Sequence, residues 1–369
     1  MVIYISAAAL TVLLGLTVDN HCRIRRGVVS RQQMLNALCL CGIFLILFAV
    51  SACRLNVGND YAKYVEFMHL IRCDAFVPTE IGFNQIVKIL YGISGFENYL
   101  LVFAFFAFFT ILLFLIAIYR QADSFAFSFF LFMAFGYYFQ SFNTVRYYLA
   151  LAIAVYAIPC VLRREWGKFL LLVLLGATLH KSLLVVFPLY ILASFAWKKW
   201  QLAIAAVFCS TFFFMQDFYL KAVVFLYPTY EDTEYLEGGT SLVNIVRCLA
   251  VFVLSLLCYK RSVKDNRRNR FYFYCNLGAL AMYVCCSFLP VISRIGYYLT
   301  VTHIFFLPAL LSGIENPRLR KLLTAGVVSA AVLYFGMFIL MKAGGDGLRI
   351  LAYETFLFHE MVPILSDVN

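Results

Sequence analysis

An arginine and a histidine lie at matching ends of two consecutive apolar segments. Arg146 precedes the segment Tyr147–Leu162, His180 follows the segment Phe169–Leu179, and a basic turn over residues 163–168 joins the two segments. Because the segments run in opposite directions from this turn, we expect Arg146 and His180 at the same end of the pair. A guanidinium binds phosphate as a bidentate fork, and an imidazole accepts protons near neutral pH. The pair therefore predicts an anion site beside a general base.

Four other polar residues next to apolar segments are candidates, namely the cations Arg54 and Arg294 and the carboxylates Asp60 and Glu80. Each has a structural alternative. An interfacial arginine can simply anchor a helix end by snorkelling, Arg54 can pair with Asp60, and Glu80 can be a solvated loop acid. His180 can likewise be a satisfied structural residue. A further cation, Arg247, lies within an apolar segment and either snorkels outward or marks a polar lumen.

The composition places these residues in a membrane protein. The chain has 369 residues, of which 64% are hydrophobic and only 13% charged, more apolar surface than a soluble protein can bury. The net charge of +11 comes from short turns between apolar segments, which is typical of topology control and does not favour a nucleic-acid partner. The cysteines lack a paired C-x-x-C spacing, and H-E-x-x-H, G-x-S-x-G and P-loop motifs are missing. We therefore expect no metal and no cofactor; a disulfide between Cys53 and Cys73 is left open.

We expect an all-α transmembrane bundle that forms one membrane domain over residues 1–369, with about twelve spans, some short or re-entrant. The first segment lacks a basic leader and a clear cleavage site, so we expect it to be retained. The sixth and seventh segments look too short to cross fully. The predicted segments are Val2–Val18, Met34–Cys53, Tyr99–Ile118, Phe125–Phe139, Tyr147–Leu162, Phe169–Leu179, Leu183–Trp197, Gln201–Met215, Leu242–Cys258, Phe271–Leu289, Ile295–Ile314 and Leu322–Met341.

Charge counting orients the bundle. With the first turn inside, nineteen of the 30 lysines and arginines fall in inner turns, and both termini face outward. Three outer segments are long. Arg54–Asn98 contains a stretch from Pro78 whose apolar spacing predicts an interfacial helix. Gln216–Ser241 is acidic and aromatic, which suits a carbohydrate-facing lid, and Gly344–Asn369 is a tail with a short amphipathic stretch.

These candidate residues stand in motifs that resemble the EpsG family of Wzy-type polysaccharide polymerases. The family pattern of Arg-Gln-x-x-Ala followed by His-x-Ser is similar to Arg146–Ala150 and His180–Ser182, although Tyr147 stands where the family usually has glutamine. The resemblance extends roughly from Arg54 to Pro308. Its other elements are Arg54 with Gly58-Asn59-Asp60-Tyr61 and Tyr64, then Glu80 with Phe83, and Arg294 with Tyr297 and Tyr298.

The resemblance implies a bacterial inner-membrane enzyme, a glycosyltransferase-type polymerase of exopolysaccharide or O-antigen. Its substrate would be an oligosaccharide repeat unit on undecaprenyl pyrophosphate, joined at the outer face, and its implied partners are membrane lipid, a chain-length regulator and a flippase. The residues fit this chemistry in three groups. Arg54, Arg146 and Arg294 would bind pyrophosphate; His180, which we favour over Asp60, would be the base; and Glu80, Tyr147, Ser182, Tyr297 and Tyr298 would contact substrate.

Two other classes remain open. A flippase for lipid-linked oligosaccharides could also have about twelve spans, but its cations should line a central cavity rather than gather at one face. An O-antigen ligase uses the same chemistry with a different acceptor, and the sequence does not exclude it.

Overall fold

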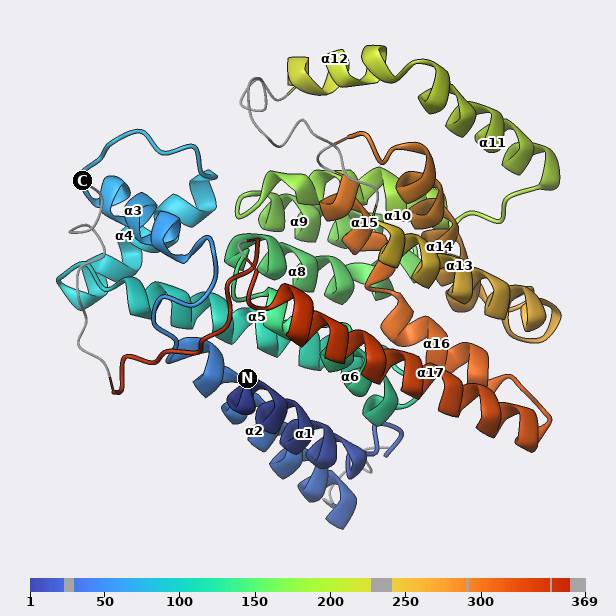
Figure 1. Cartoon of the computed structure of the whole chain (residues 1–369), viewed down its shortest axis with the longest axis horizontal. Helices are drawn as coiled ribbons and strands as arrows, with labels where there is room; N and C mark the ends of the chain where they lie inside the picture. Colours follow the sequence, from blue (N-terminus) through green and yellow to red (C-terminus); the bar gives the residue numbers. More distant parts are fainter. Residues whose placement is uncertain (23–29, 227–240, 290–291, 346, 359–369) are drawn as a thin grey trace. The chain divides into compact units, whose positions relative to one another are not determined.

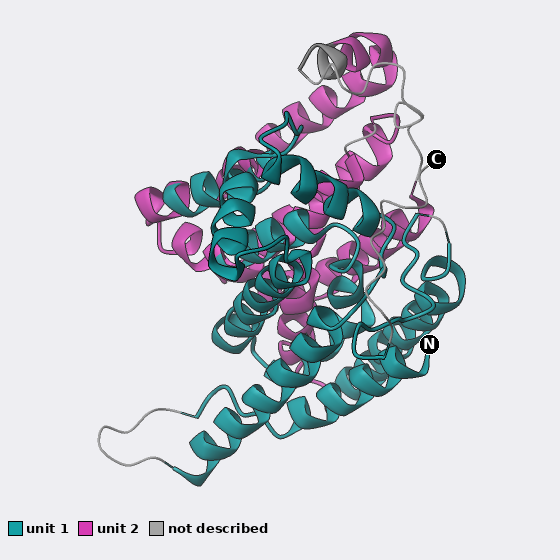
Figure 2. Ribbon diagram, turned by 90° about the vertical axis from the view of Figure 1, so that its left-hand side faces the viewer, with its two compact units in different colours: residues 1–156, 171–183, 317–369 teal, residues 157–170, 184–316 magenta. Residues whose placement is uncertain are grey.

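The computed structural model describes residues 1–22, 30–226, 241–289, 292–345 and 347–358, and their regular elements are helices apart from one isolated β-bridge. The helices cluster into two compact units that interleave along the chain (Figure 2). Unit 1 contains Met1–Tyr156, Leu171–Leu183 and Pro317–Asn369, and unit 2 contains Ala157–Leu170 and Leu184–Asn316. The expectation of a single membrane domain stays a prediction.

In unit 1, α2 lies between α1 and α5, and α6 packs against both α1 and α17 (Figure 1). The short helices α3 and α4 pack on each other, and α4 also contacts α5. The elements that lie wholly in this unit are α1 (Val2–Leu16), α2 (Arg31–Ala52), α3 (Tyr61–Arg72), α4 (Ile81–Ser94), α5 (Tyr99–Gln121), α6 (Phe125–Ala134), α7 (Tyr137–Gln140), α17 (Pro317–Met337) and the π-helix η5 (Phe338–Lys342). The helix α8 (Val145–Leu162) begins in this unit and ends in unit 2.

In unit 2, α14 is the central helix, in contact with α10, α11, α13, α15 and α16. Asn266 caps its first turn by accepting hydrogen bonds from the N–H groups of Arg268 and Asn269. The elements from the basic turn onward are α9 (Trp166–Ala177), the 3-10 helix η1 (Lys181–Val185), α10 (Val186–Ser194), α11 (Lys199–Phe214), α12 (Gln216–Leu226), α13 (Leu242–Leu257), the π-helix η4 (Tyr259–Val263), α14 (Arg267–Cys285), α15 (Ile292–Thr300) and α16 (His303–Ser312). The unit boundary passes through α8, α9 and η1.

The helical class of the prediction is confirmed, and each predicted apolar segment overlaps at least one helix, although several segments extend beyond a helix end. Among the described residues, five helices are long and apolar enough to cross a membrane: Arg31–Ala52, Tyr99–Gln121, Val145–Leu162, Ile292–Ser312 and Pro317–Lys342. Several helices fit a multi-pass membrane protein, while the count of twelve spans stays a prediction. As expected, α9 is short: its 12 residues rise about 18 Å, well below the ~30 Å of a hydrocarbon core.

The predicted helix in the first outer segment is confirmed as α4. Phe83 and Val87 are buried on one side of α4, whereas Ile89 and Ile93 are exposed on the other. Phe76, in the loop before α4, is 90% exposed. This exposed apolar side suits a helix that lies in the membrane interface.

The described part of the C-terminal segment, residues 347–358, packs along residues 53–59. The Leu55 N–H donates to Glu354 O (3.0 Å), and the Gly58 N–H donates to Arg349 O (2.9 Å). Gly58 has a φ of +109°, and a Cβ there would lie 2.6 Å from Phe142 O, so this close approach requires glycine. Residues 359–369 lie outside the described part of the chain.

Candidate functional site

Glu80 and Arg146 form a largely buried ion pair in unit 1. The Arg146 Nη1 donates to Glu80 Oε2, and the side chains of the two residues are 13% and 16% exposed. Arg146 lies in the first turn of α8, and its guanidinium carbon is 5.6 Å from the ring centre of Tyr64 and 5.2 Å from that of Phe83. The aromatic rings and the carboxylate together fix the guanidinium at the N-terminal end of α8.

His180 lies beside this pair, at the turn between α9 and η1. Its ring centre is 5.5 Å from that of Tyr147, and the next residue, Lys181, donates its N–H to Glu80 Oε1 (3.0 Å). The Nδ1 of His180 lies 2.7 Å from Ser182 Oγ. The predicted closeness of the two helix ends is thus confirmed, and Glu80 links them through its two oxygens.

Tyr64 and Asp60 belong to the same region. Burial raises the pKa of the Tyr64 hydroxyl, the charge of Arg146 opposes that rise, and the charge of Asp60 adds to it. Asp60 is the N-terminal flanking residue of α3, and its backbone N–H donates to Asn143 Oδ1 (2.8 Å). The Tyr64 phenol therefore stays protonated at neutral pH between a cation and a carboxylate.

A backbone hydrogen bond on one side and an asparagine side chain on the other hold this arrangement in place. The Gly82 N–H donates to Thr178 O (2.8 Å), and a Cβ on Gly82 would lie 2.4 Å from Thr178 Oγ1. This contact seats the start of α4, and with it Glu80, against the segment before His180. On the other side, Asn143 binds Asp60 and also donates to Gly347 O (3.2 Å), so the C-terminal segment supports the same region.

Arg54 is enclosed rather than open to a ligand. It is 1% exposed, and its guanidinium carbon lies 5.1 Å from the ring centres of both Phe103 and Phe142. Nη1 donates to Ser51 O (2.7 Å) and Ser51 Oγ (2.9 Å), while Nε and Nη2 have no hydrogen-bond partner among the described residues. Burial lowers the pKa of Arg54, and four tyrosines around it oppose that shift. The predicted phosphate contact at Arg54 remains a prediction, and its position favours a supporting role.

The remaining predicted residues lie in unit 2. Arg294 is in the first turn of α15 and partly exposed, Tyr297 is partly exposed, and the buried Tyr298 accepts at its carbonyl from the Tyr190 hydroxyl (2.7 Å). A Cβ on Gly296 would lie 2.3 Å from the Tyr283 hydroxyl, so glycine allows that ring to approach α15. The convergence of Arg54, Arg146 and Arg294 on one anion stays a prediction.

The remaining hypotheses from the sequence concern the lid, a disulfide and a metal site. Residues 227–240 of the predicted lid Gln216–Ser241 lie outside the described part of the chain. Cys53 and Cys73 are free thiols. In the described ranges, no group of three or more histidine, cysteine, aspartate or glutamate side chains is placed to hold a metal.

The resulting site combines a fixed guanidinium, a backbone N–H held by a carboxylate, an imidazole and a protonated phenol at one group of helix ends. Such a set can bind an anionic leaving group and move a proton. Neither Tyr64 nor the Lys181 N–H was predicted as a functional group from the sequence. The signal for Tyr64 was its place in the Asp60-Tyr61-x-x-Tyr64 motif, whereas a backbone N–H leaves no signal in a sequence.

The chain matches the EpsG family over residues 37–355. It belongs to that family. This EpsG-family chain contains the whole site described above within the matched range, and its membership supports a polysaccharide-polymerase role. No curated protein and no solved structure matches the chain.

Proposed function

We propose that this EpsG-family protein joins oligosaccharide repeat units carried on undecaprenyl pyrophosphate, at the outer face of the bacterial inner membrane. The observation that carries the proposal is the Glu80-linked pair of helix ends, which holds Arg146 beside His180. The positive-inside count supports the outer placement, because these cations lie at the face that the rule depletes of positive charge.

In the proposed reaction, a hydroxyl oxygen of the acceptor sugar attacks the anomeric carbon of the donor sugar. A glycosidic C–O bond forms, the bond from the anomeric carbon to the phosphate oxygen breaks, and undecaprenyl pyrophosphate leaves with the electron pair. Arg146 stabilises the charge on the leaving phosphate. Glu80 occupies one nitrogen of the guanidinium, which carries five N–H donors in all, so a phosphate can bind the same cation. The exposed side chain of Lys181 adds a second positive charge.

His180 takes the proton of the acceptor hydroxyl. With Nδ1–H donated to Ser182 Oγ at 2.7 Å, the neutral ring leaves Nε2 as the proton acceptor. The backbone N–H of Ser182 would favour the opposite tautomer, but it lies 3.4 Å from Nδ1, beyond the usual range of about 2.7–3.2 Å. A serine hydroxyl accepts as well as donates hydrogen bonds, so the 2.7 Å contact is compatible with the tautomer that this proposal requires, in which Ser182 is a positioning residue for the base.

Asp60 is the alternative base. It stands next to Tyr64, whose ring contacts Arg146, so a negative charge at Asp60 also helps to balance that cation. We therefore assign Asp60 an electrostatic role and keep the proton transfer at His180.

A deletion strain tests the class of function through its surface glycan. A polymerase deletion leaves single repeat units on the final acceptor. A flippase deletion removes surface glycan and accumulates lipid-linked units on the cytoplasmic side, whereas a ligase deletion leaves long polymer on the undecaprenyl carrier. Single capped units support the proposal, and either of the other two patterns overturns it.

A further inference from the structure

Unit 2 contains an apolar pocket that the proposed reaction does not use. It is a partly open cavity of about 320 Å³ between α10, α11, α14 and α15. Its lining is almost wholly hydrocarbon and sulfur, and includes Leu192, Phe208, Phe212, Leu277, Gly278 and Met282. Its lining runs from Tyr274 on α14 to Cys286, the residue that follows this helix, a rise of about 18 Å. A pocket of this length and composition suits a flexible hydrocarbon chain.

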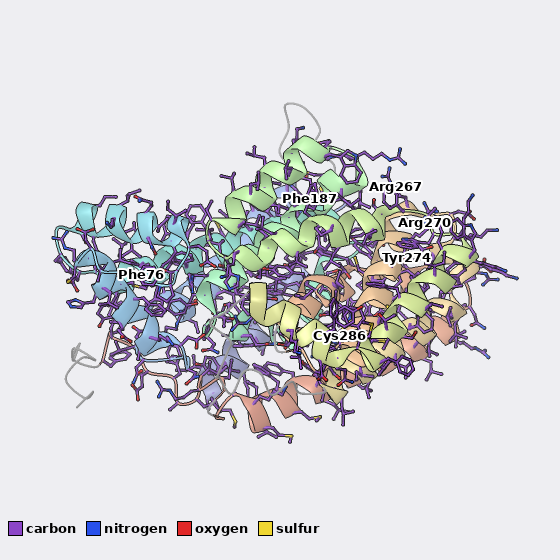
Figure 3. The ribbon with its side chains drawn as sticks, turned by 90° about the horizontal axis from the view of Figure 1, so that it is seen from above. Phe76, Phe187, Arg267, Arg270, Tyr274 and Cys286 are labelled. Carbon is purple, nitrogen blue, oxygen red and sulfur yellow. The ribbon has the colours of Figure 1, made fainter. Side chains whose placement is uncertain are left out.

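One end of the pocket is strongly cationic. Arg267 and Arg270 precede Tyr274 along α14, as Figure 3 shows, and Tyr274 interacts electrostatically with Arg270. Burial and the charges of Arg164 and Arg270 together lower the pKa of Arg267, which places three arginines near one another. Asp265 is the acidic residue on the adjoining turn, and the Arg270 guanidinium also donates to Lys264 O (3.3 Å). The cations therefore outnumber the acids at this end.

The start of α11, at the same end of the pocket, also places an aromatic residue next to cations. Trp197 lines the pocket and is followed directly by Lys198 and Lys199, which begin α11. Tryptophan and tyrosine collect at the membrane interface, between the hydrocarbon and the headgroups, and lysine and arginine lie just beyond them. From its interior to this end, the pocket is therefore lined first by apolar side chains, then by Trp197 and Tyr274, and is followed by cations. This order matches that of a lipid, from acyl chain to anionic headgroup.

We propose that this pocket binds an anionic glycerophospholipid, with one acyl chain between α11 and α14 and the phosphate headgroup on Arg267 and Arg270. Charge complementarity selects an anionic lipid, because a zwitterionic headgroup gains little from a cluster of arginines. In the predicted orientation this end faces the cytoplasm, opposite the face of Arg146 and His180, so the bound lipid is distinct from the polymerase substrate. A lipid there fills the gap between α11 and α14 and holds α11 in place.

Native mass spectrometry of the delipidated full-length protein tests the proposal. The probes are phosphatidylglycerol and phosphatidylethanolamine with identical acyl chains, and undecaprenyl phosphate. We expect wild type to retain phosphatidylglycerol at concentrations on the order of tenfold lower than phosphatidylethanolamine. Arg267→Gln/Arg270→Gln should bring the two lipids to the same affinity. Gly278→Leu/Ala281→Phe should fill the cavity and abolish tight retention of both; a Cβ on Gly278 meets only Leu299 Cδ1, at 3.5 Å.

The matched control is Arg320→Gln/Lys321→Gln, which removes two exposed charges from the start of α17, in unit 1, and should leave lipid retention unchanged. Each variant is first shown to have the elution volume and thermal stability of wild type in detergent, and a single substitution replaces any double variant that fails. Equal retention of both phospholipids by wild type overturns the proposal, as does tight binding by the cavity-filled variant. Preferred retention of undecaprenyl phosphate also overturns it, since the pocket would then be a substrate-chain site.

Discussion

Replacing Glu80 with glutamine removes the charge that faces Arg146 but keeps an oxygen that can accept from the Lys181 N–H. Both members of the ion pair are less than one-fifth exposed, and deleting one member of a buried pair costs up to about 3–5 kcal/mol. Arg146 keeps its contacts with the rings of Tyr64 and Phe83. We therefore expect the smaller loss of about 1.5–3 kcal/mol, the worth of a hydrogen bond to a charged group. If the transition state loses the same energy, the rate falls on the order of 10- to 100-fold.

Glu80→Asp tests whether this carboxylate must contact both Arg146 and the Lys181 N–H. It keeps the charge but is one methylene shorter, so it cannot reach both Arg146 and the Lys181 N–H, and we expect a comparable loss of rate. The assay is polymer formation from purified lipid-linked repeat units, with thermal unfolding of each variant in parallel. Glu97→Gln is the control, since that carboxylate pairs with His69 in the same outer segment and is 40% exposed. Wild-type rate and stability in Glu80→Gln would refute the linking role.

Three further substitutions test neighbouring contacts. Arg146→Lys keeps the charge but loses the fork, so kcat/KM should fall on the order of 10- to 100-fold, and an unchanged value would make Arg146 an anchor. Gly82→Ala should lower both activity and thermal stability because its Cβ would clash with Thr178, whereas Gly92→Ala, with nothing within 4 Å, should be neutral or stabilising. Arg54→Met should preserve donor binding, measured as KM, since replacing an enclosed cation with an apolar residue of similar volume is often tolerated; loss of donor binding in a folded variant would restore Arg54 as a phosphate ligand.

The sequence was sufficient for features that depend on local pattern. Apolar segments of sufficient length predict helices, and a short turn between two of them forces their far ends together, which places Tyr147 beside His180. The spacing of apolar residues also predicts α4. In each case the physical cause lies within a few turns of chain.

The sequence did not reveal features that depend on distant packing. The sequence left Glu80 open as either a substrate contact or a solvated loop acid, because nothing near it in sequence shows that Gly82 contacts Thr178. Arg54 looked like an open cation at the end of a span, whereas Phe103 and Phe142, from two other parts of the chain, enclose it. The return of the C-terminal segment along residues 53–59 rests on backbone hydrogen bonds, which any sequence can form.

The most direct measurement follows the reaction itself, in proteoliposomes that contain purified protein and synthetic repeat units on undecaprenyl pyrophosphate. We predict a ladder of polymer with one undecaprenyl pyrophosphate released for each linkage formed. His180→Ala should slow both by about 100- to 10,000-fold while donor binding persists, and Asp60→Asn should retain some polymer. Polymerisation by His180→Ala with none from Asp60→Asn would reverse the roles of the two residues. A wild-type protein that forms no linkage and releases no lipid pyrophosphate would contradict the account.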